Sequence, residues 1–421
     1  MDLRRFALYA ARACAVAAAW LLVDAATARA ATITVCAEGC DHATISAAVA
    51  NAADGDVVLV GAGTFRDNVA IDRPIRVRGV SSAATTVDGG GAGAVFWVTQ
   101  GVVATISDMT ITGGRRDAGA GILNQGALNL RDAVVRGNTA PDGENTFGGG
   151  VYNYGGSLSV RGVTFEANEA GYGGAILNAG TLVVGRSTFQ GNRARLGGGA
   201  VYNYSGTAII NNSIVVDNQT ATRGGGAFFN AGALAIANTT VARNISAEFG
   251  GAVFAQTGGV YVTNSTFSAN EGAYGGGGIY VLQGEGAVTS STFFGNKGAV
   301  GGALNVQLEG RLSVLNTVVA QNGSNCFGEL RSEGANIDSG VTCNFAAPGD
   351  QTSTDARLKP LAGNGGFTLT HALPADSPAV DQGDLIGCID YVGYYLATDQ
   401  RGYVRDVDGD GDGDIRCDVG A

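Results

Sequence analysis

The chain has little of what enzymes commonly use to move protons or to hold metals. Only two of its 421 residues are histidines, His42 and His371, and each stands alone in the sequence. A catalytic triad or a zinc site built on histidine is therefore not expected. Proline is also scarce, at 6 residues, so the composition is not that of a proline-rich disordered chain.

Charge is sparse and negative. Charged residues make up 15% of the chain, and the formal net charge is −11. An acidic chain is repelled by the phosphates of nucleic acids and of anionic membranes, so neither is expected as a partner. A cation, a glycan or a surface protein remains open.

Long apolar runs are missing after the first thirty residues. The early run ACAVAAAWLLV follows the basic segment MDLRR and precedes Ala28-Arg29-Ala30. This order predicts a signal peptide over residues 1–30, with cleavage after Ala30. We expect an exported protein that is extracellular or associated with the cell surface or outer membrane, without a transmembrane segment in the mature chain.

Cysteine is absent between residues 41 and 325. Cys14 leaves with the predicted signal peptide, and an even number of cysteines in an exported chain favours disulfides. Several connectivities are open, and we expect neighbours to pair. The remaining cysteines are Cys36 with Cys40, Cys326 with Cys343, and Cys388 with Cys417.

Glycine, in contrast, is abundant at 69 residues, and much of it belongs to a repeat. Motifs of the type Phe-x-x-Asn recur with one step of 24 residues and then five steps of 26 residues, and an earlier copy lies 30 residues upstream. Such regular internal spacing is typical of solenoid proteins. The closing asparagines are Asn138, Asn168, Asn192, Asn218, Asn244, Asn270, Asn296 and Asn322.

A second motif, Gly-Gly-Ala or Gly-Gly-Gly before an apolar residue, alternates with the first, as in GGAV ending at Val253. Between the motifs, stretches such as LSVRGVTF alternate apolar and polar residues, which is the period of a β-strand. Each unit therefore holds two or three short strands. Glycine and asparagine suit the turns, because both tolerate left-handed backbone.

One unit cannot bury its apolar face alone, but a stack of units can. The sequence therefore predicts an all-β fold, a single right-handed parallel β-helix with repeats over residues 114–322. Residues 31–113 are expected to form an N-terminal helical cap and the first coils, and residues 323–421 an irregular, disulfide-bearing C-terminal cap. The side chains expected to stack inside are Phe267 and its equivalents Phe165, Phe189, Phe293, Val241 and Val319.

The two repeat motifs resemble those of the chlamydial polymorphic outer-membrane proteins. The run TISAAVANAADGDVVLVGAGTFRDNVAIDRPIRVRG is similar to the opening of pectin-modifying and other right-handed β-helix proteins. The tail, which begins LAGNGGFTLTHALPADSPAVDQGD, resembles the C-terminal region of exported bacterial β-helix proteins with variable surface anchors. These resemblances imply the fold and export, and no particular activity.

Acids are sparse in the repeats and do not recur in register. Polysaccharide-active enzymes need paired carboxylates, or a base beside a cation. We therefore predict a non-catalytic protein for adhesion, display, or binding of a carbohydrate or protein partner. The alternative is a polysaccharide lyase, hydrolase or epimerase on the same fold, and a cluster of charged side chains in one groove would favour it.

Two further rows accompany the repeat. The first consists of asparagines, and a ladder that satisfies turn amides is its expected role. The second is aromatic and leaves two alternatives open, the core or an outward strip that stacks on sugars. The asparagines are Asn124, Asn153, Asn178, Asn203 and Asn230, and the aromatic residues are Tyr152, Tyr202, Phe229, Phe254 and Tyr280.

The tail segment DVDGDGDGDIRCD places a carboxylate at every second position. Closely spaced carboxylates repel one another unless a cation joins them, and calcium prefers hard oxygen ligands in a glycine-rich loop. The alternating acids resemble the start of an EF-hand loop and the calcium repeats of thrombospondin. The hypothesis is a calcium site formed by Asp406, Asp408, Asp410, Asp412, Asp414 and Asp418.

Overall fold

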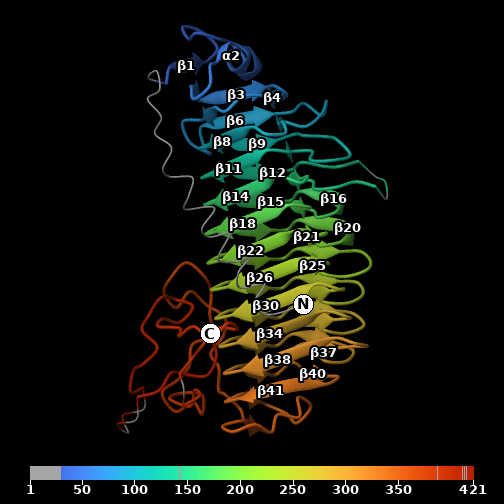
Figure 1. Cartoon of the computed structure of the whole chain (residues 1–421), viewed down its shortest axis with the longest axis vertical. Helices are drawn as coiled ribbons and strands as arrows, with labels where there is room; N and C mark the ends of the chain where they lie inside the picture. Colours follow the sequence, from blue (N-terminus) through green and yellow to red (C-terminus); the bar gives the residue numbers. More distant parts are fainter. Residues whose placement is uncertain are drawn as a thin grey trace.

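The computed structural model describes residues 30–141, 143, 145–385, 387–409, 411, 413 and 415–421. The predicted signal peptide lies outside these residues except for Ala30, and so do Asp410, Asp412 and Asp414 of the predicted calcium site. The described chain is a tall stack of coils, with a helix at one end and an irregular segment along one side of the other half (Figure 1).

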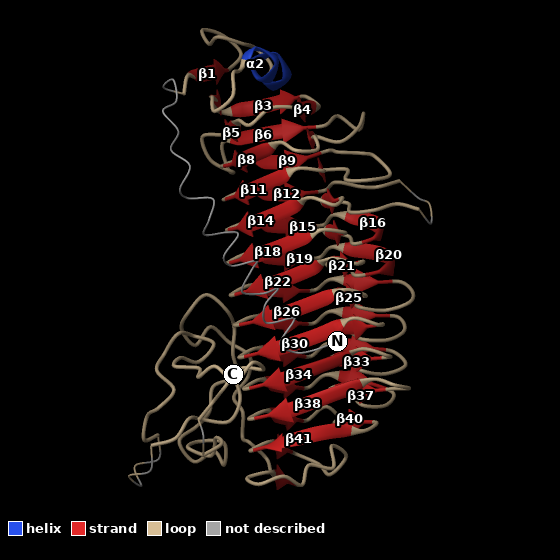
Figure 2. Ribbon diagram, in the orientation of Figure 1, coloured by secondary structure: helices blue, strands red, loops and turns tan. Residues whose placement is uncertain are grey.

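Three long parallel sheets run along the stack, and a short fourth sheet flanks them (Figure 2). Sheet A has 13 strands: β1 (Thr32–Val35), β2 (Val57–Val60), β5 (Arg76–Arg78), β8 (Val103–Ser107), β11 (Ala127–Arg131), β14 (Ser157–Arg161), β18 (Thr181–Gly185), β22 (Thr207–Asn211), β26 (Ala233–Ala237), β30 (Gly259–Thr263), β34 (Glu285–Thr289), β38 (Arg311–Leu315) and β41 (Leu330–Gly334). Sheet B also has 13: β3 (Gly63–Arg66), β6 (Thr85–Asp88), β9 (Thr110–Thr112), β12 (Val134–Arg136), β15 (Thr164–Glu166), β19 (Thr188–Gln190), β23 (Ile214–Val216), β27 (Thr240–Ala242), β31 (Thr266–Ser268), β35 (Thr292–Phe294), β39 (Val318–Ala320), β42 (Ile337–Asp338) and β43 (Gln351–Thr352).

Sheet C has 11 strands: β4 (Val69–Ile71), β7 (Phe96–Val98), β10 (Ile122–Asn124), β13 (Val151–Asn153), β17 (Ile176–Asn178), β21 (Val201–Asn203), β25 (Phe228–Asn230), β29 (Val253–Ala255), β33 (Ile279–Val281), β37 (Leu304–Val306) and β40 (Cys326–Phe327). Sheet D has 6: β16 (Glu169–Tyr172), β20 (Arg193–Gly197), β24 (Gln219–Thr220), β28 (Ile245–Ser246), β32 (Glu271–Gly272) and β36 (Lys297–Gly298). Each strand pairs in parallel with its counterpart on the next coil, so the predicted parallel β-solenoid is confirmed.

The core consists of side chains stacked in columns along the axis. The residues predicted to stack inside are fully buried on sheet B. The rings of Phe165 and Phe189 lie 4.8 Å apart, as do those of Phe267 and Phe293. Identical residues therefore repeat at the strand spacing, about 4.8 Å, and each coil buries the apolar face of its neighbour.

The asparagines that close the repeats form a buried ladder. Asn244 shows the pattern: its backbone N–H and its Nδ2 both donate to Oδ1 of Asn270, at 3.0 and 2.9 Å. The same Nδ2 donates to the carbonyl of Val215 on the preceding coil, at 2.9 Å. One amide thus satisfies polar groups on three successive coils, in a place where water cannot reach them.

The prediction that the ladder asparagines themselves adopt left-handed backbone is wrong. None of the ladder asparagines has a positive φ. The left-handed residue is instead the one before each, for example Asp217 (φ 59°) before Asn218 and Arg243 (φ 54°) before Asn244. The ladder position therefore selects asparagine for its side-chain hydrogen bonds, whereas the left-handed position before it is occupied by residues as different as Asp217, Ala269 and Gly295.

The helix α2 (Ile45–Asn51) lies over the first coils and contacts β1, β2 and β4. Oγ1 of Thr44 accepts a hydrogen bond from the N–H of Ala47 at 3.3 Å, which caps the start of the helix. The apolar face of the helix is buried, so α2 covers strand edges that would otherwise be open. This face consists of Ile45, Ala48, Val49 and Ala52.

The C-terminal region has two parts. Residues 326–352 continue the coils through β40 to β43, so the stack extends beyond the repeat boundary predicted at residue 322. From residue 355 on, the described part of the chain lies along the side of the stack instead of over its end (Figure 1). The reason lies in sheet B, whose outward threonines on β27, β31 and β35 provide hydrogen-bonding groups for this segment.

Buried polar side chains attach this lateral segment. Gln400 accepts a hydrogen bond from Thr266 at 2.7 Å and donates to Thr240 at 3.1 Å. Nε2 of His371 lies 3.0 Å from Oγ of Ser268. Arg405 is buried and donates to the carbonyls of Asp418 (3.2 Å) and Gly420 (2.8 Å) and to Oδ1 of Asn264 on the coils.

Burial lowers the pKa of Arg405 to about 10, although Asp399 and Asp418 favour its charged form. The guanidinium is thus still charged at neutral pH and is held mainly by oxygens of backbone and amide groups.

The described residues contain three disulfides, and their pairing is the one expected from the sequence: Cys36–Cys40, Cys326–Cys343 and Cys388–Cys417. Within the described residues, no helix is long and apolar enough to cross a bilayer.

Replacing Asn244 with Leu tests the ladder. The change leaves the amide groups of Asn218 and the carbonyl of Val215 without their partner in the core. We expect the free energy of unfolding to fall by about 1–3 kcal/mol, the usual penalty for an unsatisfied buried polar group. Chemical denaturation provides the measurement, and Gln256→Leu at an exposed position is the control. Equal losses in the two variants would contradict the ladder.

Acidification should loosen the lateral segment at His371. Burial lowers the pKa of His371 below its ordinary 6.5, although its hydrogen bond to the carbonyl of Lys359 raises it. A depressed histidine pKa means that the stabilisation is complete above pH 6.5 and is lost as the pH falls through the folded-state pKa. The protection factors for hydrogen exchange in residues 355–373, which correct for slower intrinsic exchange at low pH, should therefore fall at pH 5. His371→Gln should show a smaller pH dependence, and an unchanged dependence would refute this role.

Candidate functional site

The outer face of sheet C carries a column of large side chains. Strand register places one on each coil, because each pairs with its counterpart on the next strand. Inward neighbours such as Val201 and Asn203 are buried in the core, so the column points away from it. Its members are Trp97, Leu123, Tyr152, Leu177, Tyr202, Phe229, Phe254 and Tyr280.

Most of this column is nevertheless covered. Leu177, Tyr202, Phe229, Phe254 and Tyr280 form a second apolar cluster outside the main core. Side chains from sheet D and from the loops around it pack over this cluster, among them Phe147, Tyr172 and Phe249. The predicted aromatic row is thus neither part of the solenoid core nor a bare surface strip. It is the floor of an aromatic layer built on sheet C.

Exposed tyrosines form the rim of this layer. Tyr154, Tyr204 and Tyr274 have 56%, 59% and 60% of their surface exposed. The ring of Tyr154 lies 5.4 Å from that of Tyr152, and the ring of Tyr204 lies 6.3 Å from that of Tyr202. Each exposed ring therefore rests against a covered one, which restricts its motion. We call Tyr152, Tyr154, Tyr172, Tyr202, Tyr204 and Tyr274 the tyrosine face.

Burial keeps one hydroxyl group of the tyrosine face protonated. Burial, together with a smaller contribution from Tyr172, raises the pKa of Tyr202 to about 12. The hydroxyl therefore stays protonated at neutral pH and can act as a hydrogen-bond donor and acceptor. The guanidinium of Arg223 lies 5.7 Å above the ring of Tyr172, a cation–π contact at the edge of the face.

The second asparagine row consists of the last residues of sheet C strands, next to this face. Its members are buried, and Nδ2 of Asn153 donates to Oδ1 of Asn178 at 2.7 Å, while Nδ2 of Asn178 donates to Oδ1 of Asn203 at 2.8 Å. These amides are already occupied by one another and by turn carbonyls. They hold the backbone of the tyrosine face in register and are not exposed to a ligand.

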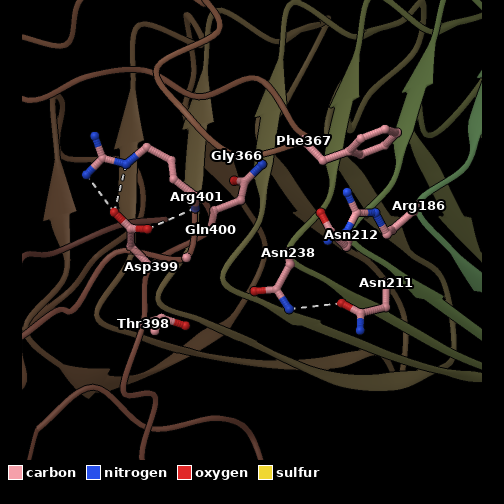
Figure 3. A pocket seen from close by; sticks show the side chains of 11 residues that line it. Arg186, Asn211, Asn212, Asn238, Gly366, Phe367, Thr398, Asp399, Gln400 and Arg401 are labelled. Atoms are coloured by element: carbon pink, nitrogen blue, oxygen red, sulfur yellow. Dashed lines mark hydrogen bonds and ion pairs between the residues drawn. The ribbon is translucent and has the colours of Figure 1, made fainter.

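A cleft of about 470 Å³ lies elsewhere, between the lateral segment and the turns that join sheets A and B (Figure 3). Arg186, Asn212 and Asn238 line it from the coils, and Phe367 and Arg401 line it from the lateral segment. Among the described residues, its one carboxylate is Asp399, which accepts a hydrogen bond from Arg401 at 2.8 Å. Glycoside hydrolysis needs two carboxylates across the bond, and this lining offers one.

The described acids of the Asp-rich tail bind separate groups. Asp408 accepts hydrogen bonds from the N–H groups of Gly411 (2.6 Å) and Gly413 (3.1 Å), and Asp406 accepts one from the hydroxyl of Tyr395. Asp418 accepts one from the N–H of Asp381 at 3.1 Å, and burial raises its pKa. The residues that the structure describes contain no group of three His, Cys, Asp or Glu side chains suited to a metal.

The rim tyrosines were not identified from the sequence. The signal that could have identified them is the tetrapeptide VYNY, which occurs at residues 151–154 and 201–204. Its second and fourth residues differ in exposure. The former is packed on sheet C, and the latter is exposed in the turn that follows the buried asparagine. Alternation in a strand predicts the outward direction of both, but not the loops that cover one of them.

Comparison with known proteins gives one match to a sequence family. Residues 186–204 match the Chlamydia polymorphic membrane protein repeat. This stretch runs from the turn before β19 to the exposed Tyr204, and so includes one closing asparagine, one glycine motif and part of the tyrosine face. No curated protein matches the chain.

Several solved structures are similar at low identity. Alginate lyase from Paenibacillus sp. str. FPU-7 is 14% identical, with a TM-score of 0.40 over 72% of this chain and 99% of that chain. Pectin methylesterase PemA from Erwinia chrysanthemi is 14% identical, with a TM-score of 0.29 over 61% and 81%. Pectin methylesterase from carrot is 11% identical, with a TM-score of 0.31 over 73% and 90%. The chain is thus a parallel β-solenoid that carries a repeat similar to that of the Chlamydia polymorphic membrane proteins.

Proposed function

We propose that the chain is an exported, non-catalytic surface protein that binds a glycan on its tyrosine face. The observation that carries the proposal is a rim of exposed tyrosines fixed against a covered aromatic layer. The match to a polymorphic membrane protein repeat supports a location at the surface or outer membrane. The order of residues in the predicted signal peptide supports export.

Stacking on sugars is the chemistry that suits this face. A pyranose ring has an apolar face of C–H groups. A partly exposed tyrosine ring can pack against this face while the tyrosine hydroxyl forms hydrogen bonds. Tyrosines held by packed neighbours lose little conformational entropy when a ligand binds. Tyr154 and Tyr204 are fixed in this way by Tyr152 and Tyr202.

The arrangement also suits an extended ligand. Tyr152 pairs with Leu177, which pairs with Tyr202, so the two tyrosine pairs stand two coils apart. At a strand spacing of about 4.8 Å, that separation is roughly 10 Å along the stack. An oligosaccharide that runs parallel to the axis would therefore meet both pairs.

The alternative is a polysaccharide lyase, hydrolase or epimerase on the same coils. The cleft beside the lateral segment, with its Asp399–Arg401 pair, is the observation in its favour. An enzyme would shorten or modify a bound polysaccharide, whereas a binding protein releases it unchanged. Product analysis after long incubation with the glycans that bind distinguishes the two functions.

Removing the rim rings should weaken glycan binding. In the Tyr154→Ala/Tyr204→Ala variant, each lost stacking contact costs about 0.5–1.5 kcal/mol, so the dissociation constant should rise roughly tenfold. A glycan array identifies the ligand, and calorimetry on the best ligand gives the constants. Both residues are exposed, so the thermal midpoint should not change.

Tyr394→Ala is the matched control, because Tyr394 is more exposed than either rim residue and lies on the lateral segment. It should bind as the wild type does. If the double variant keeps full affinity, or if the array shows no binding at all, the tyrosine face is not a glycan site.

We also propose that the Asp-rich tail binds calcium. The alternating acids from Asp406 to Asp414 carry this hypothesis, together with the glycines between them. Calcium that binds only the folded form stabilises it by about 2.7 kcal/mol at a hundredfold excess over the dissociation constant. Chelation should therefore speed up hydrogen exchange in residues 399–421 and leave the coils unchanged.

The Asp408→Asn/Asp410→Asn variant should resemble the chelated wild type at every calcium concentration, with magnesium left out. If protection of the tail is the same with calcium and with chelator, the calcium site is refuted. If chelation also loosens the coils, calcium has a wider structural role than we propose.

A further inference from the structure

A row of arginines marks the corner where sheet A turns into sheet B. Arg131 ends β11, Arg161 ends β14, and strand register pairs the two on adjacent coils. On the next coil, Arg186 takes the left-handed turn position between β18 and β19, with a φ of 49°. All three side chains are exposed, and within the described part of the chain none of them forms an ion pair.

This row leads into the cleft beside the lateral segment. Arg186 lies at the edge of the cleft, with its guanidinium 5.8 Å from the centre of the Phe367 ring. Figure 3 shows Arg186, Asn212 and Phe367 close together on one side, and Asp399 with Arg401 on the other. The cleft thus continues the arginine row with an exposed ring and amide groups.

We infer that the arginine row and the cleft bind a linear anionic glycan that lies along the stack. Guanidinium groups match carboxylate and sulfate oxygens in a two-pronged geometry. Successive coils lie about 4.8 Å apart, so the row offers one cation per coil to charges that recur along an extended chain. Phe367 can stack on one sugar ring, and the amides can bind its hydroxyls.

The proposed site can bind an anion although the whole chain is acidic, because only charges close to the ligand act on it strongly. The net charge is −11, but salt screens charges that lie more than about 8–10 Å apart. For a ligand in contact with the arginine row, attraction by the unpaired guanidinium groups outweighs repulsion by the distant acids. A single-stranded nucleic acid needs several aromatic platforms for its bases, whereas Phe367 is the one aromatic residue among the described residues that line the cleft.

An exposed acid next to the arginine row allows a variant that should strengthen binding. Asp132 follows Arg131 and is exposed at the same left-handed turn position, with a φ of 46°. Its carboxylate faces solvent beside the arginines and would repel an anionic ligand. Replacing it with the isosteric Asn should therefore strengthen binding, which a merely structural role would not do.

The experiment measures binding of polygalacturonate, heparin, dextran and single-stranded DNA to the mature chain at low and physiological salt. Polygalacturonate and heparin distinguish carboxylate from sulfate, and dextran is the neutral reference. We expect at least one anionic glycan to bind, with a steep dependence on salt. Arg161→Ala and Arg186→Ala should each weaken it on the order of tenfold, and Asp132→Asn should strengthen it a few-fold.

Arg193→Ala is the matched control, because Arg193 is also exposed but belongs to β20 of sheet D. It should leave binding unchanged. Failure of both anionic glycans to bind, an equal loss with Arg193→Ala, or DNA binding as tight as glycan binding would each overturn the inference. The tyrosine-face variant separates this site from the proposed function, since it should keep its affinity for the anionic glycan.

Discussion

Everything in this molecule depends on keeping successive coils in register, and buried asparagine amides enforce that register. An apolar column tolerates small shifts along a strand, since a displaced phenylalanine still finds an apolar neighbour. An amide ladder does not, because a shift of one residue leaves donors and acceptors unpaired in the core. Two ladders, one near sheet B and one beside sheet C, fix the strands between them at both ends.

Because of this register, equivalent side chains of successive repeats form continuous rows on the surface. A side chain that faces outward on one coil is followed by its counterpart about 4.8 Å further on, so small differences between repeats become rows with a distinct chemistry. On sheet C the row is aromatic, and at the corner between sheets A and B it is basic over three coils. The lateral segment covers the polar outer side of sheet B on later coils, which divides the stack into a covered and an open half.

Much of the architecture could be predicted from the sequence, because the repeat shows directly which residues are equivalent. The steps of 26 residues specified the coils, and alternation specified the inward side chains such as Phe267. The disulfide pairs followed from separation along the chain. The docking of residues 355–421 could not be predicted, because it depends on single polar contacts, such as that of Gln400 with Thr266. Such contacts leave no periodic pattern in the sequence. For the same reason, the covered and exposed tyrosines of VYNY look alike until the loops around them are placed.

The asparagine ladder has a direction, and its two ends differ. Each Nδ2 points to Oδ1 on the following coil, so the amide dipoles are aligned head to tail and can polarise one another. The row begins where Oδ1 of Asn138 accepts the N–H of Gly114, and it reaches Asn325 through Asn322. There the last amide donates to a carboxylate, that of the buried Asp338. The ladder thus has an electrical polarity like that of a helix, with the carboxyl group of Asp338 at its positive end.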